Sequence, residues 1–318
     1  MRLETDGPGI PNGWFAVAWS KELDHGEVKR IDCFDDELVL FRARSGEPKV
    51  LSAYCPHLGV HMGEGGRVMG ETIRCPYHGW QYDGNSGECT VIPYCDRIPK
   101  GAQVKPWPVV ERNRMILVWH HAEDKPPHWE VPTVPHLEDP EWAEPRCFDL
   151  EVPVHMQDMA ENNLDPVHFH YIHGAATIPE TEFSFGEDGR FLKAISYTKV
   201  DTPAGSFDME LIRDTWGLGL SSVESKGIPG VGLFMFSSTT PINNRLTKSR
   251  WLLFSTKGAI DTAGEEWFDG ITNGVMDDWR FWCNKKMTTR PVLCEADKPL
   301  AEFRRWAKQF YSDSQAGK

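Results

Sequence analysis

The feature that most constrains this chain is a pair of short loops, each of which carries one cysteine and one histidine. The first loop, in the stretch YCPHLGV, holds Cys55 and His57, and the second, in RCPYHGW, holds Cys75 and His78. Two cysteines and two histidines can bind one zinc ion tetrahedrally, and zinc commonly occupies such a set. The chain must therefore bring two separate loops together around metal.

The spacing within these loops favours two metal ions over a single zinc. Cys-x-His keeps its two side chains close together, whereas zinc loops usually have about two to four residues between ligands. In a Rieske [2Fe–2S] cluster both cysteines bind one iron and both histidines the other, so each loop sends its ligands to two neighbouring metals. Pro56 and Pro76 stiffen the loops, while Gly59 and Gly79 let backbone N–H groups turn toward the sulfides. The sequence therefore predicts a Rieske cluster, with zinc as the alternative.

Composition limits the partners. The chain has 318 residues, enough for two domains, and a net charge of −13. This charge gives no basic surface for nucleic acid or for an acidic membrane, so small molecules or proteins are the expected partners. The N-terminal stretch lacks an apolar signal region, and no run of about 18 uncharged apolar residues occurs. Six further cysteines lack the spacing of a secreted disulfide framework, so we expect free thiols and a cytoplasmic location.

Two domains joined by a linker are predicted. Short β-rich runs such as WFAVAW, ELVLFRA, KVLSAY and MILVWH indicate a small all-β domain at residues 1–122. Residues 123–145 are rich in proline and acidic residues, which favours a linker over a regular element. Residues 146–318 form the second predicted domain.

The second domain combines strands and helices. CFDLEVPVHMQDMAENNL is expected to run from a strand into a helix, and several β-rich runs follow between residues 191 and 256. The C-terminal part is predicted to be helical, because Phe303, Trp306 and Phe310 recur at helical spacing.

A second metal site is indicated by the stretch AENNLDPVHFHYIHG, which places Asp165, His168, His170 and His173 within nine positions. Oxygen-activating non-haem iron takes two histidines and one carboxylate and keeps other positions open. His168 and His173 fit as the pair, and His170 with His173 is a less favoured pair. Alternatively, Asp165 is only a helix N-cap and the histidines are surface residues.

The five-residue spacing of His168 and His173 requires a bend or an end of the helix between them. On an ideal helix the two side chains would point about 140° apart. Pro166, just upstream, is the expected cause of the bend, and Gly174 offers an exit from the helix.

The carboxylate is expected in the stretch VMDDWRFWCNKK. Asp278 and Trp282 lie four residues apart on one face of a predicted helix, and Asp277 points about 100° away. The competing interpretation is an acid on the helix surface.

With both stretches considered, the chain resembles the oxygenase (α) subunits of Rieske non-haem iron oxygenases over nearly its full length. CPH, seventeen residues and CPYH match the cluster motif of that family, and NNLDPVHFHYIH matches its Asp-x2-His-x4-His iron motif. Val60 and Tyr77 stand where respiratory Rieske proteins have disulfide cysteines. YCPHLGVHMGEGGRV, IRCPYHGWQYDG and RIPKGA followed by WPVVERN resemble the branch of ketosteroid 9α-hydroxylases and sterol 7-desaturases.

The resemblance implies an α+β fold, in which an all-β Rieske domain precedes a helix-grip (START-like) domain with an antiparallel sheet and C-terminal helices. It also implies a homotrimer with electron transfer between subunits. Asp165 would bridge His168 to the His78 of a neighbouring subunit, and Asn162 is a weaker candidate beside it. The pattern Asp-x3-Trp-x2-Lys of that branch selects Asp278 as the third iron ligand.

The implied activity is that of a terminal monooxygenase that hydroxylates an apolar, steroid-like substrate with dioxygen. Electrons would come from a separate ferredoxin or flavin/iron–sulfur reductase, because the chain has no complete Gly-x-Gly-x-x-Gly after a strand. Within the family, an aromatic-ring hydroxylase or an O- or N-demethylase is the alternative. A Rieske electron carrier or redox sensor without oxygenase activity is the alternative from a different class.

Overall fold

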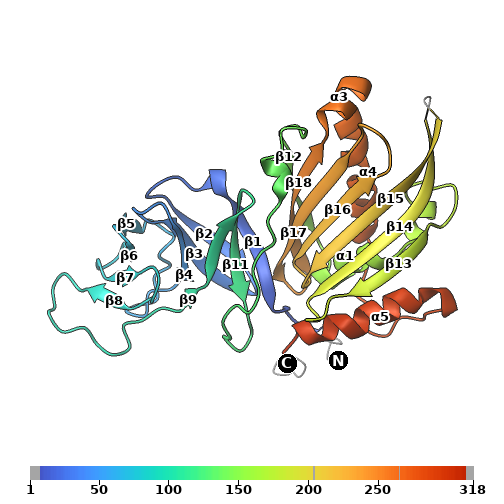
Figure 1. Ribbon diagram of the computed structural model, residues 1–318. Coiled ribbons are helices and arrows are strands. Elements are labelled where there is room, and N and C mark those ends of the chain that lie inside the picture. The colour runs from blue at the N-terminus through green and yellow to red at the C-terminus, as the bar shows by residue number, and fades with distance from the viewer. Residues whose placement is uncertain (1–7, 203–204, 265, 313–318) are drawn as a thin grey trace. The chain divides into compact units, whose positions relative to one another are not determined.

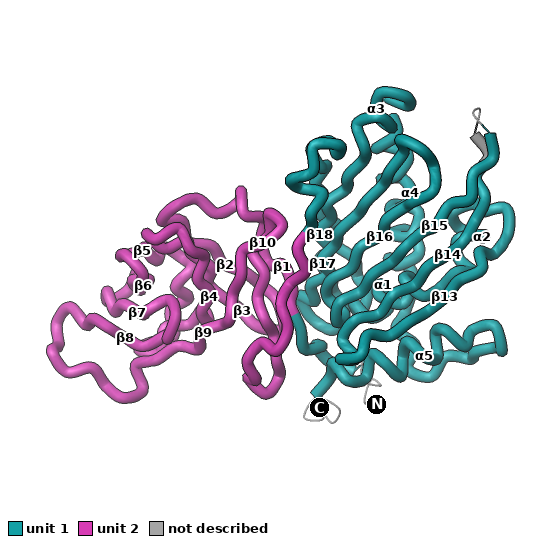
Figure 2. The backbone as a smooth tube through the Cα atoms, viewed as in Figure 1, with its two compact units in different colours: residues 1–13, 134–318 teal, residues 14–133 magenta. Residues whose placement is uncertain are grey.

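The chain divides into two compact units. The structure, a computed structural model, describes residues 8–202, 205–264 and 266–312. Residues 14–133 form one unit, and residues 134–318 together with 1–13 form the other (Figure 2). The division between residues 133 and 134 falls inside the predicted linker, all of which is described and which contains the 3₁₀ turn Pro135–Leu137. The domain limits of 122 and 146 stay predictions.

The N-terminal residues differ from the predicted assignment to the first domain. The backbone N–H of Asn12 donates to the carbonyl of Phe310 at 2.6 Å, and Nε2 of His155 lies 3.0 Å from the carbonyl oxygen of Gly9. These two contacts tie the segment to the second unit. The sequence does not reveal them, because both depend on main-chain atoms of the segment, which no side-chain pattern identifies.

The unit of residues 14–133 consists of three small sheets, ordered β1-β11-β10, β2-β3-β4-β9 and β5-β6-β7-β8. In chain order the strands are β1 (Gly13–Trp19), β2 (Val28–Cys33), β3 (Asp36–Arg42), β4 (Pro48–Ser52), β5 (Arg67–Met69), β6 (Thr72–Arg74), β7 (Gln81–Asp83), β8 (Cys89–Val91), β9 (Pro106–Trp107), β10 (Val109–Arg112) and β11 (Met115–His120). The four predicted β runs correspond to β1, β3, β4 and β11. Every residue of β1 and β11 is buried, as expected of continuous apolar runs.

The second unit is built on a seven-stranded sheet in the order β12-β18-β17-β16-β15-β14-β13 (Figure 1). All six neighbouring pairs are antiparallel. Its strands are β12 (Arg146–Val152), β13 (Glu180–Phe185), β14 (Phe191–Thr202), β15 (Gly205–Trp216), β16 (Leu220–Lys226), β17 (Leu233–Asn243) and β18 (Leu246–Ser255). The sheet supplies a broad face on which helices and a ligand can pack.

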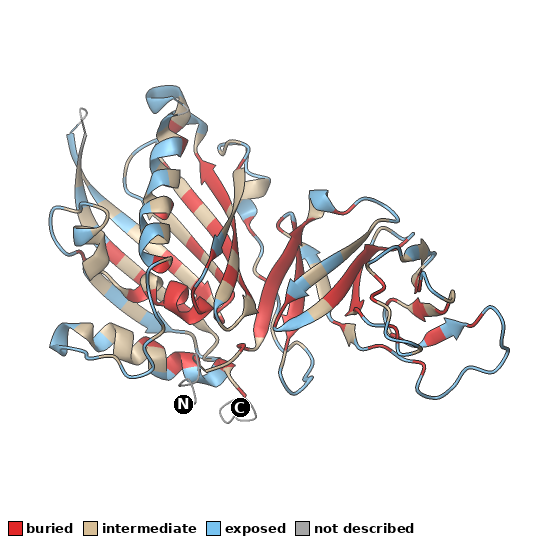
Figure 3. Cartoon of the chain, turned by 180° about the vertical axis from the view of Figure 1, so that it is seen from behind, coloured by how far each residue is buried: buried red, intermediate tan, exposed pale blue. Residues whose placement is uncertain are grey.

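Helices cover one face of this sheet. The helices are α1 (Met156–Ala160), α2 (Val167–Tyr171), α3 (Lys257–Ala263), α4 (Glu266–Trp282) and α5 (Lys298–Ala307), with 3₁₀ turns at Glu161–Leu164, Glu295–Asp297 and Lys308–Phe310. A further 3₁₀ turn, Ser20–Glu22, belongs to the unit of residues 14–133. In Figure 3, seen from behind, α4 lies over the sheet and exposes its outer side.

Helix α4 runs alongside the edge strand β12. Its buried residues Phe268, Val275 and Trp282 recur every seven positions and so share one face. Phe268 packs under the guanidinium of Arg146, and Trp282 belongs to an apolar cluster with Val152 at the other end of β12. This packing directs the same face of α4 toward the interior.

Helix α5 confirms the predicted C-terminal helix. The antiparallel sheets and the helices together confirm the α+β class. Phe303 is fully buried, and Trp306 and Phe310 are also buried. Nε1 of Trp306 donates to the carbonyl of Gly189 at 2.5 Å, which attaches α5 to the turn between β13 and β14. Among the described residues, no helix has the length and apolar character needed to cross a membrane.

Candidate metal centres and the adjoining cavity

The two Cys/His loops have the same backbone geometry. In the first, Cys55 N–H donates to the carbonyl of Val60 at 2.9 Å, and Gly59 N–H donates to the carbonyl of Cys55 at 2.9 Å. The second loop repeats both bonds at the matching positions, at 2.8 and 3.1 Å. Gly59 and Gly79 have φ of +71° and +77°, a left-handed conformation that glycine adopts without strain. The glycines predicted to shape the loops are therefore required by the turns themselves.

In the two loops the cysteine side chains lie near each other, and so do the histidine side chains. Cys55 and Cys75 are both buried, and Cys55 is close enough to Cys75 to affect the ionisation of its thiol. The rings of His57 and His78 lie with their centroids 4.7 Å apart. Among the described residues, these four side chains do not form a tight cluster around a single point. The tight cluster of metal-ligating side chains lies elsewhere and is described below. The pairing of cysteine with cysteine and histidine with histidine thus fits two irons better than one zinc.

Burial disfavours a free thiolate at Cys75. Desolvation raises the pKa of the Cys75 thiol, and the proximity of Cys55 raises it further, although the backbone N–H groups of Tyr77 and His78 act in the opposite direction. A bound metal deprotonates coordinating thiols and removes this penalty. The residues present therefore fit a [2Fe–2S] cluster.

Two aromatic residues that the sequence analysis missed contact the cluster ligands. The hydroxyl of fully buried Tyr82 lies 3.1 Å from Sγ of Cys55, and burial raises the pKa of Tyr82, so the hydroxyl stays protonated and can donate to the sulfur. Trp80 stacks on His57 with the ring centroids 4.5 Å apart and the planes 8° from parallel. Both residues lie in a stretch too short for periodicity to mark them.

The predicted iron stretch folds into a single helical turn. Helix α2 begins at Val167 and ends at Tyr171, before His173. Gly174, with φ of +71°, follows the end of the helix, and Ala175 N–H donates to the carbonyl of Phe169 at 3.0 Å. The expected end between the two histidines is observed.

Pro166 was wrongly assigned as the cause of that end. It lies at the N-terminal boundary of α2, where its fixed φ suits a helix start and cannot interrupt the helix later. Oδ1 of Asp165 accepts from the N–H groups of Val167 at 2.9 Å and His168 at 3.3 Å, so Asp165 does cap the helix.

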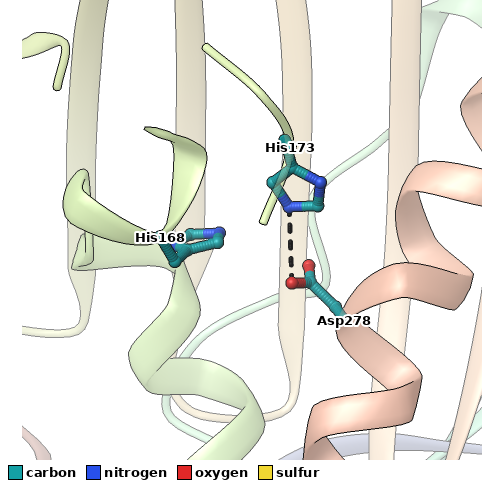
Figure 4. A group of neighbouring side chains, drawn as sticks. All are labelled: His168, His173 and Asp278. Atoms are coloured by element: carbon teal, nitrogen blue, oxygen red, sulfur yellow. Dashed lines mark ion pairs between the residues drawn. The ribbon is translucent and has the colours of Figure 1, made fainter. Parts of the chain in front are cut away.

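Because α2 ends early, His168 and His173 converge with Asp278 of α4 (Figure 4). One ligand atom from each of the three lies within 4.8 Å of the others. Nε2 of His173 forms an ion pair with Oδ1 of Asp278 at 3.3 Å. Nδ1 of His168 lies 3.8 Å from Oδ2 of Asp165, which leaves Nε2 of His168 for a metal.

The electrostatics of this trio suit a cation. Burial lowers the pKa of His168, which favours the neutral imidazole that a metal needs. The contact with the Asp278 carboxylate raises the pKa of His173, against the effect of burial. Oδ1 of Asp278 is buried without a well-aligned hydrogen bond. Two imidazoles and one carboxylate that leave further positions open match a mononuclear non-haem iron site.

The other predicted candidates lie outside the trio. Nδ1 of His170 lies 2.5 Å from the carbonyl oxygen of Ala175, and Asp277 is exposed on the outer side of α4. Asn162 lines the cavity described next. The less favoured pair of His170 with His173 is therefore not brought together.

A cavity of about 290 Å³ adjoins the trio. It is bounded by α2, by one face of α4 including Ile271 and Val275, and by the neighbouring strands β15, β16, β17 and β18. Most of the lining is apolar, and His168, His173 and Asp278 form part of the wall. Pockets for small molecules have this character, with volumes from roughly 300 Å³ upward.

Comparison with known proteins decides the family. Residues 13–108 match the Rieske [2Fe-2S] domain, and residues 118–311 match the 3-ketosteroid 9alpha-hydroxylase C-terminal domain. The chain is a Rieske oxygenase of the 3-ketosteroid 9α-hydroxylase family. Its cofactors are a [2Fe–2S] cluster and mononuclear non-haem iron, and as an oxygenase component it depends on a separate electron donor.

Relatives of the oxygenase are named for sterol and steroid chemistry. Cholesterol 7-desaturase of Caenorhabditis elegans is 30% identical, over 96% of this chain and 78% of the relative. A probable 3-ketosteroid-9-alpha-monooxygenase, oxygenase component, of Rhodococcus rhodochrous is 29% identical, over 95% of this chain and 80% of the relative.

Solved structures share the fold at lower identity. A mutant of NdmA of Pseudomonas putida CBB5 with theobromine has a TM-score of 0.75 at 20% identity, covering 93% of this chain and 89% of the other. Dicamba monooxygenase with non-heme iron and dicamba has a TM-score of 0.69 at 19% identity, covering 96% and 98%. These likenesses support the predicted fold.

The hydrogen bond from Tyr82 to Cys55 generates a prediction for the cluster. Tyr82→Phe removes a donor that stabilises the reduced, more negative cluster, so the reduction potential is expected to fall by about 40 mV, as a hydrogen bond of about 1 kcal/mol requires for one electron. A redox titration followed by EPR measures this. Tyr94→Phe is the control, because the Tyr94 hydroxyl bonds Trp80 instead of a sulfur. Equal potentials for wild type and Tyr82→Phe would contradict the assigned bond.

Proposed function

We propose that the oxygenase hydroxylates an apolar, steroid-like substrate held in the cavity beside the trio. The observation that carries the proposal is that His168, His173 and Asp278 form one wall of an apolar cavity. The cavity lining spans four neighbouring strands, which is roughly 14 Å at the usual strand spacing and suits an elongated molecule. The relatives named for cholesterol and 3-ketosteroid chemistry support a substrate of this class.

The proposed metal ligands follow from the two sites. Cys55, His57, Cys75 and His78 would hold the cluster, and His168, His173 and Asp278 would hold the mononuclear iron. When bound, the cluster supplies single electrons and the iron supplies the activation of dioxygen.

Asp165 is proposed as the residue that couples the two centres. Its Oδ2 lies 3.8 Å from Nδ1 of His168, within reach of a hydrogen bond after a small adjustment, while its Oδ1 is fixed by the start of α2. A carboxylate there holds the proton on Nδ1 of His168 and makes the other ring nitrogen a better ligand. The family resemblance adds a contact to His78 of a neighbouring subunit. The homotrimer, the type of reductase and the cytosolic location stay predictions.

The geometry argues against an electron carrier without oxygenase activity. A carrier needs the cluster alone and gains nothing from two buried histidines and an aspartate beside an apolar cavity. Three irons per chain are expected of the oxygenase, and two of a carrier.

Asp278→Ala should remove the mononuclear iron and leave the cluster intact. Two histidines alone bind iron weakly, so iron is expected to fall from about three to about two per chain while the visible absorption of the cluster stays unchanged. Iron analysis and absorption spectroscopy measure both. Asp277→Ala, at an exposed position of the same helix, is the control and should retain all three. Unchanged iron in Asp278→Ala would show that the ligand assignment is wrong.

Asp165→Asn should keep both metal centres but lower turnover by about tenfold or more, the usual loss when a partner of a metal-bound histidine is changed. The amide oxygen of asparagine can still cap α2, so the fold is expected to be preserved. Steady-state oxygen uptake and the rate of electron transfer after flash reduction are the measurements. Full activity would remove Asp165 from the coupling role.

The substrate class is tested with reconstituted holoenzyme, a surrogate reductase and NADH, against sterols, 3-ketosteroids and simple aromatic acids. We expect oxygen uptake coupled to a steroid product that has gained one oxygen atom. A product that has lost two hydrogens would indicate desaturation instead. Coupled turnover confined to aromatic acids would contradict the steroid-like substrate, and iron at two per chain would contradict the oxygenase.

A further inference from the structure

Arg213 is a buried cation in the wall of the cavity. It lies on β15, where Leu211, Arg213 and Thr215 alternate onto the same face and all three line the cavity. Its exposed fraction is 1%.

The contacts of Arg213 use only part of its donor capacity. Nη2 donates to Oγ of Ser196 at 2.5 Å, and the guanidinium lies over the ring of Phe169, 4.9 Å from its centroid. Nε and Nη1 are buried, and neither has a hydrogen-bond partner among the described residues. Within the part of the chain that the structure describes, the charge that affects Arg213 is that of Asp165.

This arrangement is costly without a further acceptor. Burial lowers the pKa of Arg213 to about 10, so the side chain remains charged at neutral pH. A guanidinium has five N–H donors and no acceptor, and buried donors without partners carry a desolvation penalty. Arg213 lines the cavity, and a small rotation of its side chain would bring the buried Nε or Nη1 to an acceptor there.

We propose that Arg213 is a specificity-determining residue that donates hydrogen bonds to an acceptor oxygen of the substrate, a ketone or a carboxylate. This inference rests on the proposed function in so far as the substrate occupies this cavity. A guanidinium can bind such an oxygen through two N–H groups at once, which fixes orientation as well as position.

The position of Arg213 links substrate orientation to the metal site. Phe169, which covers the guanidinium, directly follows the proposed ligand His168 on α2. Anchoring one oxygen of an otherwise apolar molecule at Arg213 therefore fixes which part of that molecule faces the trio. An apolar wall alone would allow the substrate to slide and turn.

A purely structural role makes a different prediction. If Arg213 served only to bind Ser196 and Phe169, its replacement would change stability but would affect oxygen-bearing and oxygen-free ligands equally. The ratio of their affinities separates the two roles.

The experiment measures binding to the holoenzyme from the change in the EPR spectrum of its ferrous nitrosyl form. One series of ligands is androstane, its three-keto derivative and its carboxylic acid derivative, and the other is naphthalene, acetylnaphthalene and naphthoate. Wild type should bind the oxygen-bearing members about ten- to hundredfold more tightly than the hydrocarbon in at least one series, the gain expected of hydrogen bonds to a charged group. Preference for the acid over the ketone identifies a carboxylate as the recognised group, and the reverse identifies a ketone.

Arg213→Met keeps the bulk of the side chain and removes its donors, so the affinity ratio should fall to near one. Arg213→Lys should retain part of it. Arg250→Met is the matched control, because Arg250 is buried on β18 next to cavity-lining Trp251, faces the other side of the sheet and has partners of its own. Its ratio should equal that of wild type.

Two results would overturn the proposal. One is a wild type that binds the hydrocarbons as tightly as the oxygen-bearing ligands, a result that needs no variant. The other is an Arg213→Met protein with the wild-type ratio. If only the aromatic series binds in an Arg213-dependent way, the steroid-like substrate fails while the role of Arg213 stands. If steroids are turned over but their binding does not depend on Arg213, the steroid-like substrate stands and the role of Arg213 fails.

Discussion

The candidate iron site depends on the early end of one short helix. An uninterrupted helix from Val167 would turn His168 and His173 away from each other, whereas the end at Tyr171 and the left-handed Gly174 let both imidazoles face Asp278 of α4. One turn of helix is not stable by itself. The sheet, α4 and the capping carboxylate of Asp165 supply the support that this turn lacks.

Two buried acidic side chains and their basic partners hold the neighbouring segments in place. Nζ of Lys285, just beyond the end of α4, lies 3.1 Å from Oδ1 of Asp158 on α1. Glu161, at the next turn, accepts from Arg304 of α5 at 2.8 Å. Asp158 is fully buried, and this burial raises its pKa, an effect that the neighbouring Lys285 opposes. Such pairs contribute little net stability but disfavour other arrangements of the three segments, because separating them would leave charges buried alone. The C-terminal end of α4 and helix α5 are thus held close to α1 and the 3₁₀ turn that follows it, the segment that leads into α2.

The two proposed metal sites were predictable to different degrees for a physical reason. Each cluster loop is closed by hydrogen bonds between residues four or five positions apart, so its composition and its geometry are both local. The iron site needs Asp278, more than a hundred residues after the histidines, and helical phase alone could only distinguish it from Asp277. Tyr82 and Arg213 carried weaker signals. The period-two pattern of β15 does place Arg213 with Leu211 on the buried face, but no local rule shows that two of its nitrogens lack partners.

The sequence by itself predicted the loop chemistry, the strands and helices with strong periodicity, and a favoured histidine pair, because these depend on neighbours along the chain, and the α+β class followed from the family resemblance. The tertiary structure decided which carboxylate meets that pair, that Pro166 starts the helix instead of bending it, that residues 8–13 join the second unit, and that a buried arginine lines the cavity. Each of these depends on contacts between segments distant in sequence, whose approach is set by the packing of a whole sheet and its helices and not by any single stretch of residues.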